Sequence, residues 1–308
     1  MNIVFLGTPK FAESVLQGLI DSRHNVIAVV TQEDKKVGRK QVITFPPVKE
    51  LALKHNIPVY QFPKIRRDGV EILKSLNADV FITAAYGQII SQEILDIPKF
   101  CTLNVHGSLL PKYRGASPVQ WCLIKGETET GITIMRTDAG IDTGDMILKG
   151  SVKIDSEDNS ETLFDKLSKI ATPLLLEVLD QIEKGTVKYI PQGEDFTYFP
   201  MLKKEDGKID FNLKSEEIVN LVRGLYMWPN AYFNYEDKIV KVFKAESVSF
   251  EDKNYKCGEI VCASKQGLIV KCKDSFLKIL ELQAENSKRM DYKSFLNGNK
   301  WEVGTILK

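Results

Sequence analysis

Residues 103–115 read LNVHGSLLPKYRG, and this stretch carries the most information in the chain. It opens as a strand and passes into a loop that contains glycine and proline, after which Ser117-Pro118 predicts the start of a helix. Asn104 and His106 therefore lie at the carboxyl end of a strand, where open α/β sheets bind their ligands. Because side chains at i and i+2 share one face of a strand, the amide and the imidazole point the same way. We predict a site here that offers two hydrogen-bond donors to one developing oxyanion.

The sequence around this stretch alternates between apolar runs and segments with helical spacing. The first helix is expected to begin at Pro9, with Thr8 as its N-cap. Strands are expected at Asn2–Leu6, Val26–Thr31, Val80–Thr83 and Cys101–Val105, and further helices at Pro47–His55 and Val70–Leu76. Strands separated by helices in this way predict an α/β fold, a Rossmann-like and mostly parallel sheet with helices on both faces.

The second half of the chain changes character. Ile132–Met135 predicts a strand, and the apolar residues from Leu163 to Ile182 keep helical spacing across Pro173, which favours two helices or one kinked helix. From about Gly207 onward short strand-like runs alternate with turns, and they predict a small, OB-like β barrel; the runs are Ile239–Phe243, Gly258–Ala263, Leu268–Cys272 and Leu277–Leu282. We expect a catalytic domain at residues 1–188, a linker at residues 189–206 and a C-terminal domain at residues 207–308.

Composition narrows the class of protein. Hydrophobic residues make up 43% and charged residues 27% of the chain, as in a soluble globular protein. No apolar run approaches the roughly 20 residues that span a bilayer, and no targeting segment is recognised, so we expect a cytoplasmic protein without membrane contact. The net charge of +1 does not favour wrapping of duplex nucleic acid, although a local RNA contact stays open. The five cysteines form no C-x-x-C pair and are expected to be reduced and mostly buried, and no metal site is predicted.

An Asn-x-His pair alone is more often a satisfied polar pair at a strand end. A second polar segment strengthens the case for His106, because Asp138–Met146 follows a strand and carries three aspartates and two glycines. This segment could be a simple turn or a metal loop, but EF-hand spacing fails and no glutamate stands at the bidentate position. Gly7-Thr8-Pro9-Lys10 lacks both the dinucleotide and the Walker pattern, so a glycine-rich phosphate site is disfavoured.

These motifs resemble those of the formyltransferases that use 10-formyltetrahydrofolate. The block Asn104–Pro111, with Tyr113-Arg114-Gly115 and Ser117-Pro118 after it, looks like the family's signature. Gly131–Met135 leading to Asp142–Asp145 is similar to the second motif. The resemblance runs nearly end to end, since four shorter segments also fit: Phe5–Pro9, Thr31–Asp34, Val222–Gly224 and Trp228-Pro229. Lys112-Tyr113 departs from the frequent arginine-tryptophan pair but keeps a charge and an aromatic ring.

The resemblance implies roles for individual residues. Asn104, His106 and Asp142 match the catalytic trio. Three segments match those that bind the folate, namely Ala84-Ala85-Tyr86-Gly87, Ser108-Leu109-Leu110-Pro111 and Thr137-Asp138-Ala139-Gly140-Ile141. Arg39, with Lys36 and Lys40 in the same basic loop, is expected to contact the acceptor end of a tRNA, and the C-terminal barrel is expected to help hold that tRNA.

The implied reaction is transfer of a formyl group from 10-formyltetrahydrofolate to the amino group of initiator methionyl-tRNA, by a monomer that needs no metal. Asn104 and His106 are expected to donate N–H groups to the oxyanion, and Asp142 to orient His106 or a proton-relaying water. Two alternatives stay open. One is the same core acting on a small acceptor, such as an amino sugar nucleotide or glycinamide ribonucleotide, which the basic loop and the second domain disfavour. The other is an RNA-binding protein without catalysis, which the intact trio disfavours.

Overall fold

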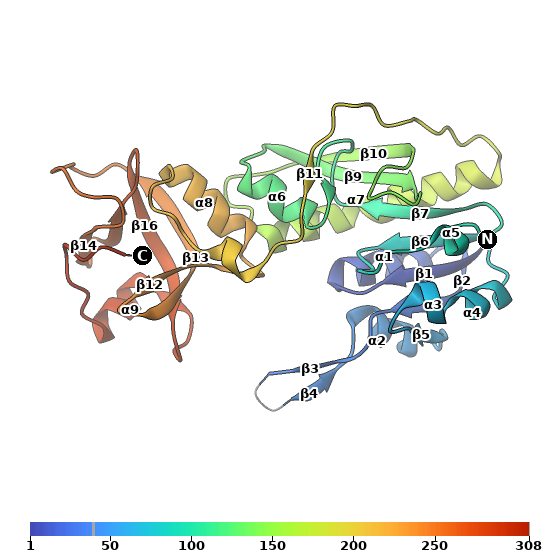
Figure 1. Ribbon diagram of the computed structural model, residues 1–308, viewed down its shortest axis with the longest axis horizontal. Coiled ribbons are helices and arrows are strands. Elements are labelled where there is room, and N and C mark those ends of the chain that lie inside the picture. Colours follow the sequence, from blue (N-terminus) through green and yellow to red (C-terminus); the bar gives the residue numbers. More distant parts are fainter. Residues whose placement is uncertain (39–40, 308) are drawn as a thin grey trace. The chain divides into compact units, whose positions relative to one another are not determined.

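The computed structural model describes residues 1–38 and 41–307, which form two compact units (Figure 1). Unit 1 comprises Met1–Gly115, Glu129–Lys153 and Phe164–Tyr198. Unit 2 comprises Ala116–Thr128, Ile154–Leu163 and the described chain from Phe199 onward. Each unit has a sheet of its own and is described separately below.

Unit 1 is built on a seven-stranded sheet with the order β10-β9-β7-β6-β1-β2-β5. The five strands from β7 to β5 pair in parallel, whereas β9 runs antiparallel to both of its neighbours. The strands are β1 (Asn2–Gly7), β2 (Asn25–Thr31), β5 (Val59–Gln61), β6 (Val80–Ala84), β7 (Cys101–His106), β9 (Glu129–Arg136) and β10 (Met146–Lys153). The predicted mostly parallel sheet is confirmed.

Helices cover both faces of this sheet. Val4 and Leu6 of β1 belong to a buried cluster that includes residues of α3 (Ile65–Asp68), α4 (Val70–Ser75) and α5 (Gln92–Leu95). Phe5 points the opposite way, because side chains alternate along a strand, and lies with Ala12 of α1 (Lys10–Ile20) around Gly7. Helix α1 packs closely on α7 (Ser160–Glu183), since a Cβ at Gly18 would stand 2.2 Å from Thr172. Helix α2 (Pro47–Lys54) lies between β2 and β5 along the chain.

One local prediction is wrong, one open alternative is decided, and one pair of strands was not predicted. Helix α1 starts at Lys10 with Pro9 as N-cap, because the Thr8 hydroxyl donates to the Tyr86 carbonyl (2.9 Å) rather than to the helix. Helix α7 is one helix with Pro173 inside it, which excludes two separate helices. The basic loop contains an antiparallel pair of short strands that the sequence did not reveal, β3 (Lys35–Val37) and β4 (Val42–Thr44) (Figure 1).

Unit 2 contains an antiparallel sheet with the order β12-β13-β16-β15-β14, and β17 also pairs with β16. The larger of its buried clusters brings Ile218 and Val222 of a helix together with Phe233 and Val240 of the sheet, and a smaller cluster contains Val261, Cys262, Ile269 and Phe276. The antiparallel sheet confirms the predicted small C-terminal barrel. The strands are β12 (Ala231–Tyr235), β13 (Lys238–Val248), β14 (Ile260–Ser264), β15 (Gly267–Lys271), β16 (Phe276–Ala284) and β17 (Met290–Asp291). The helices are α6 (Pro118–Ile124), η1 (Lys204–Gly207), α8 (Ser215–Gly224) and α9 (Tyr292–Gly298), and two short strands, β8 (Arg114–Gly115) and β11 (Tyr198–Phe199), lie at unit boundaries along the chain.

Candidate active site

Asn104 and His106 lie at the carboxyl end of β7, beside β6 on one side and β9 on the other. The parallel register places Thr83 of β6 opposite Asn104, and the Thr83 hydroxyl lies 2.9 Å from Asn104 Oδ1. The Asn104 amide nitrogen donates to Asp142 Oδ1 (3.3 Å). The amide group is thus oriented from both ends, with its oxygen toward the sheet and its nitrogen toward the aspartate.

Asp142 comes from the loop between β9 and β10 and joins the two residues of β7. Its Oδ1 lies 3.6 Å from His106 Nδ1, and its Oδ2 accepts a hydrogen bond from the Gly115 amide (2.9 Å). Its backbone has a left-handed φ of 53°, which aspartate adopts more readily than most residues. The structure therefore brings together the three residues predicted as a catalytic trio.

The hydrogen bond of His106 decides which of its ring nitrogens carries the hydrogen in the neutral ring. His106 is buried, and its Nε2 lies 2.9 Å from the carbonyl oxygen of Tyr113. A carbonyl oxygen only accepts, so Nε2 carries a proton and donates it. In the neutral ring Nδ1, which faces Asp142, has a lone pair and no hydrogen. The expectation that His106 donates an N–H to an oxyanion is thereby restricted to the protonated ring.

The predicted folate segment Ser108–Pro111 is held to the sheet. The buried Thr133 hydroxyl of β9 donates to the Ser108 carbonyl (2.7 Å) and accepts from the Leu110 amide (3.1 Å). The Lys149 ammonium of β10 donates to the Leu110 carbonyl, and burial lowers the pKa of Lys149. Leu110 is buried with two methionines of the neighbouring strands. The segment has a defined backbone path before any ligand binds.

The predicted segment Ala84–Gly87 follows β6 directly. Ala85 and Gly87 are exposed and have positive φ values, whereas Tyr86 is buried. The Tyr86 carbonyl accepts from Thr8 and from Gln32, and burial raises the pKa of the Tyr86 hydroxyl. The turn thus places two exposed residues at the end of the strand next to Asn104.

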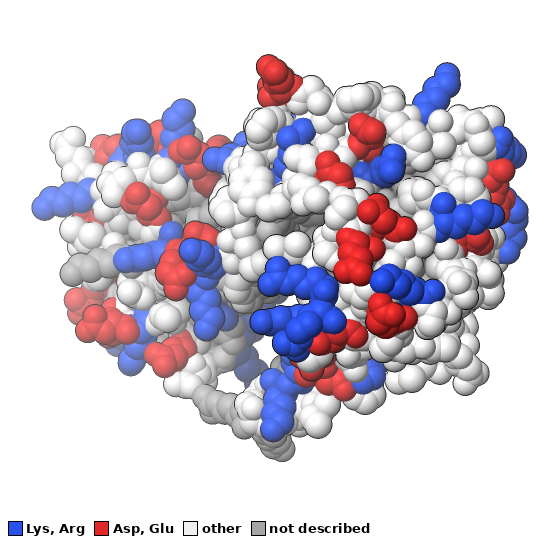
Figure 2. Space-filling model, turned by 45° about the vertical axis from the view of Figure 1, so that its right-hand side comes forward, with Lys and Arg blue, Asp and Glu red and all other residues white. Residues whose placement is uncertain are grey.

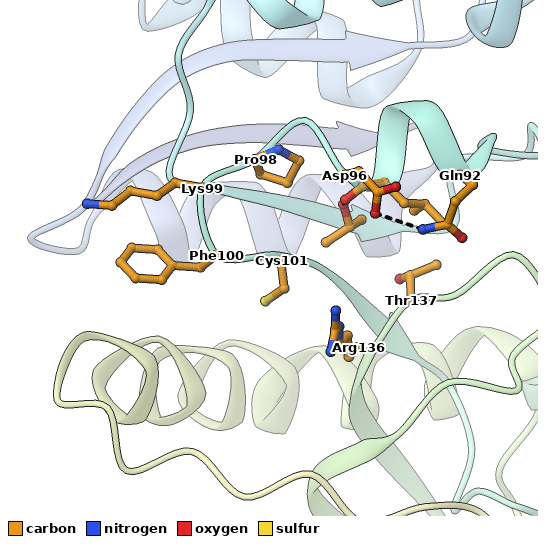
Figure 3. A pocket seen from close by; sticks show the side chains of 10 residues that line it. Gln92, Asp96, Pro98, Lys99, Phe100, Cys101, Arg136 and Thr137 are labelled. Carbon is orange, nitrogen blue, oxygen red and sulfur yellow. Dashed lines mark hydrogen bonds between the residues drawn. The ribbon is translucent and has the colours of Figure 1, made fainter.

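The predicted segment Thr137–Ile141 leaves β9 and leads to Asp142. The Thr137 amide donates to the Thr102 carbonyl of β7 (2.8 Å), and residues 138–141 are exposed. A polar cavity of about 240 Å³ lies where this segment begins. Gln92 and Asp96 line one side of the cavity, and Arg136 and Thr137 line the other (Figure 3). The Thr137 hydroxyl is buried and has no hydrogen-bond partner among the described residues.

The chain from Tyr189 to Thr197 lies within the predicted linker, yet it is bonded to these loops. Ile190 exchanges two backbone hydrogen bonds with Met146, at 2.8 and 2.9 Å. Thr197 accepts from the amides of Tyr113 and Arg114 (2.8 Å each). Gln192 bonds to Arg114, Asp142 and Gly144. Sequence reasoning gave these residues no role, because nothing in their local pattern indicates such partners.

The basic loop is only partly described. Lys36 is exposed on β3, and Arg39 and Lys40 lie outside the described residues. Val42, Ile43 and Phe45 beside them are exposed hydrophobic residues. Figure 2 shows basic and acidic side chains interspersed over the visible face, with one group of basic side chains near its centre.

Other features concern metals, thiols and membranes. Within residues 1–38 and 41–307 no group of three or more His, Cys, Asp or Glu residues could hold a metal ion. Four of the cysteines are buried and Cys257 is half-buried, which confirms the prediction of mostly buried thiols. None of the helices in the described chain combines the length and the apolar character that a membrane crossing requires.

Comparison with known proteins shows which family this chain matches. Residues 1–179 match the formyl transferase family, and residues 201–300 match the formyl transferase C-terminal domain. The chain belongs to the formyl transferase family. The predicted family is therefore confirmed, and with it the prediction that the protein is an enzyme.

Relatives and solved structures extend the match over the whole chain. The chain is 45% identical to a methionyl-tRNA formyltransferase of Geobacter metallireducens, over 100% of this chain and 98% of that protein. It is also 45% identical to a methionyl-tRNA formyltransferase of Clostridioides difficile, over the full length of both. Its fold is similar to that of a sugar 3N-formyl transferase crystallised with dTDP and 5-N-formyl-THF (TM-score 0.66, 24% identity, 94% of this chain and 99% of that chain). As a formyl transferase, the protein matches both the family's main model and its C-terminal model along one chain.

Proposed function

We propose that this formyl transferase moves a formyl group from 10-formyltetrahydrofolate to the amino group of initiator methionyl-tRNA. The observation that carries the proposal is the contact of Asn104, His106 and Asp142 at one strand end, in a chain 45% identical to two methionyl-tRNA formyltransferases. The proposal includes a catalytic domain at residues 1–188, a connection at residues 189–206 and a tRNA-holding domain at residues 207–308.

The acceptor is an α-amino group, whose pKa near 8 makes its neutral form accessible at physiological pH. In the reaction the nitrogen forms a bond to the formyl carbon, and the bond from that carbon to the folate nitrogen breaks. Negative charge develops on the formyl oxygen, and one proton must leave the amine and reach the folate nitrogen. The protein has to stabilise the charge and carry the proton.

Asn104 is proposed to stabilise the charge. Its amide nitrogen has two hydrogens, one of which is directed to Asp142 Oδ1. The second can donate to the formyl oxygen. Because Thr83 and Asp142 orient the amide beforehand, the donor needs no rearrangement as the charge develops.

His106 and Asp142 are proposed to move the proton. Tyr113 holds the Nε2 hydrogen, so Nδ1 of the neutral ring can accept the proton of the attacking amine and then release it toward the folate nitrogen. The Asp142 carboxylate, 3.6 Å from Nδ1, stabilises the imidazolium formed between the two transfers. The Gly115 amide keeps that carboxylate in place.

The folate is proposed to bind against Ala84–Gly87, Ser108–Pro111 and Thr137–Ile141. The residues present suit it, because residues 85, 87 and 138–141 are exposed and their free backbone N–H and C=O groups could pair with the edge of a flat pteridine. The exposed side chain of Ile141 offers an apolar contact to the ring. When bound, this co-substrate supplies the formyl group.

The tRNA is proposed to contact the basic loop, through Lys36, Arg39 and Lys40, and the C-terminal domain. A basic loop suits contacts with phosphates, and such contacts release counterions. Weaker tRNA binding at higher salt is therefore expected, with little change in folate binding. Arg39→Ala should raise the KM for tRNA and leave folate affinity intact.

The decisive experiment is an acceptor competition. The purified protein is given 10-formyltetrahydrofolate with charged initiator tRNA, an amino sugar nucleotide or glycinamide ribonucleotide, and formylated products are separated by mass spectrometry. Transfer to the charged tRNA at a much higher kcat/KM supports the proposal. Preference for either small acceptor, or no transfer at all, rejects it.

A further inference from the structure

Gln192 uses both ends of its amide group to join two catalytic loops of unit 1. Its Nε2 donates to the carbonyl oxygens of Asp142 and Gly144, both at 2.8 Å. Its Oε1 accepts from Arg114 Nε at 2.9 Å. A side-chain amide has two donor hydrogens, so both are used, and Gln192 is satisfied by these partners alone.

The partners of Gln192 are themselves restrained. Arg114 is buried, and its guanidinium lies 4.3 Å from the centre of the Phe196 ring. Gly144 has no space for a side chain, because a Cβ would stand 1.9 Å from the Arg136 carbonyl oxygen. Gln192 follows the backbone pair of Ile190 with Met146. The amide is held on both sides by groups that have little freedom to move.

We propose that Gln192 is a positioning residue for formyl transfer, acting through the backbone of Asp142. The inference rests on the function proposed above. The carbonyl that Gln192 holds and the carboxylate that faces Asn104 and His106 belong to the same residue. Asp142 has a left-handed φ of 53°, and a change in φ that moved its carbonyl would also move its side chain.

The bond to Arg114 extends this restraint to the other catalytic loop. Arg114 precedes Gly115, whose amide donates to Asp142 Oδ2, and follows Tyr113, whose carbonyl accepts from His106. One side chain therefore connects the loop that orients His106 with the loop that carries Asp142. Displacement of reacting groups by about 1 Å can lower a rate about 10²-fold, so loss of this connection is expected to lower kcat.

The test compares two variants of equal length with the wild type. Gln192→Glu keeps an acceptor for Arg114 and loses both donors to the Asp142 and Gly144 carbonyls. Gln192→Met loses all three hydrogen bonds. The matched control is Gln17→Glu on α1, where the glutamine amide donates to the exposed Asp21 side chain. Steady-state kcat and both KM values are measured, with amide hydrogen exchange of residues 141–145 in the free protein.

For Gln192→Glu we expect kcat to fall by at least about tenfold and up to about 100-fold, with both KM values within about threefold of wild type. The kcat of Gln192→Met should fall by a similar factor. Amide hydrogen exchange of residues 141–145 should become faster in both Gln192 variants and stay unchanged in Gln17→Glu. The inference is overturned if Gln192→Glu keeps kcat within twofold of wild type, because the bond to Arg114 would then suffice. Loss of folate binding in step with kcat, or unchanged exchange in residues 141–145, also overturns it.

Failure of the proposed function gives a different result. If wild type prefers a small acceptor, the function is rejected, and the kinetic comparison is made with that acceptor. If wild type transfers to no acceptor, hydrogen exchange still decides whether Gln192 holds the Asp142 loop.

Discussion

The structure makes a quantitative prediction for Asn104→Asp. The substitution keeps the shape of the side chain and the oxygen that faces Thr83, but it replaces the nitrogen that faces Asp142 with a carboxylate oxygen. Two carboxylates then stand at the 3.3 Å separation that the hydrogen bond has now. An attraction becomes a repulsion between like charges in a partly buried site.

Coulomb's law at an effective dielectric constant of 20 gives about 5 kcal/mol for unit charges at this separation. Keeping one of the two carboxyl groups protonated costs less than this repulsion. The cost is about 4 kcal/mol at pH 7 for a carboxyl with an ordinary pKa near 4. The folded variant therefore holds a proton that the unfolded chain has released. Its stability deficit should be about 4 kcal/mol at pH 7 and shrink by about 1.4 kcal/mol for each unit that the pH falls.

Calorimetry between pH 5 and pH 8 is the suitable assay, because Trp121, Trp228 and Trp301 all lie in unit 2 and their fluorescence would not report on unit 1. Asn56→Asp, at an exposed position, is the control for the added charge. Activity should fall by about 10²- to 10³-fold, as expected for loss of an oxyanion donor. A pH-independent stability difference from wild type, or more than a tenth of the wild-type kcat, would refute this reasoning.

Three further predictions concern features other than the trio. Burial lowers the pKa of His24, so just below the ordinary pKa of about 6.5 the unfolded chain binds more protons than the folded protein. The free energy of unfolding should therefore fall as the pH drops through that region. Calorimetry of His24→Asn should show a flatter dependence of stability on pH. Burial raises the pKa of Cys101 to about 11 and of Cys272 to about 12. The half-buried Cys257 should therefore react first with a thiol reagent at pH 8, and Cys257→Ser should lose the fastest phase of that labelling reaction. Formyl transfer should survive a chelator, and inactivation that added zinc reverses would contradict this.

Some of the site could be predicted because it depends on short-range geometry. Asn104 and His106 are two residues apart on a strand, so their common face follows from the alternation of side chains. The position of this strand end follows from the alternation of strands and helices. The roles of Asn104, His106 and Asp142 came from the resemblance to formyltransferases and remain predictions until the variants are measured.

Other features depend on contacts between distant residues. Gln192 lies 50 residues from Asp142 in the chain, and Thr133 lies 25 residues from Ser108. A glutamine or threonine in a sequence gives no sign of the carbonyl it will meet, because that depends on the path of the intervening chain. Thr8 shows the same limit, since an ordinary helix cap was expected and the hydroxyl bonds to the turn after β6 instead.

The sequence alone determined the fold class and the strand end that carries the polar pair, because periodicity and turn residues act over a few positions. The tertiary structure decided how those groups can work. The Tyr113 carbonyl selects the tautomer of His106, Gly115 and Gln192 hold the two ends of Asp142, and Thr133 with Lys149 holds the Ser108–Pro111 segment. Each of these is a hydrogen bond between segments that only folding brings within 3 Å, and its direction depends on which partner can donate.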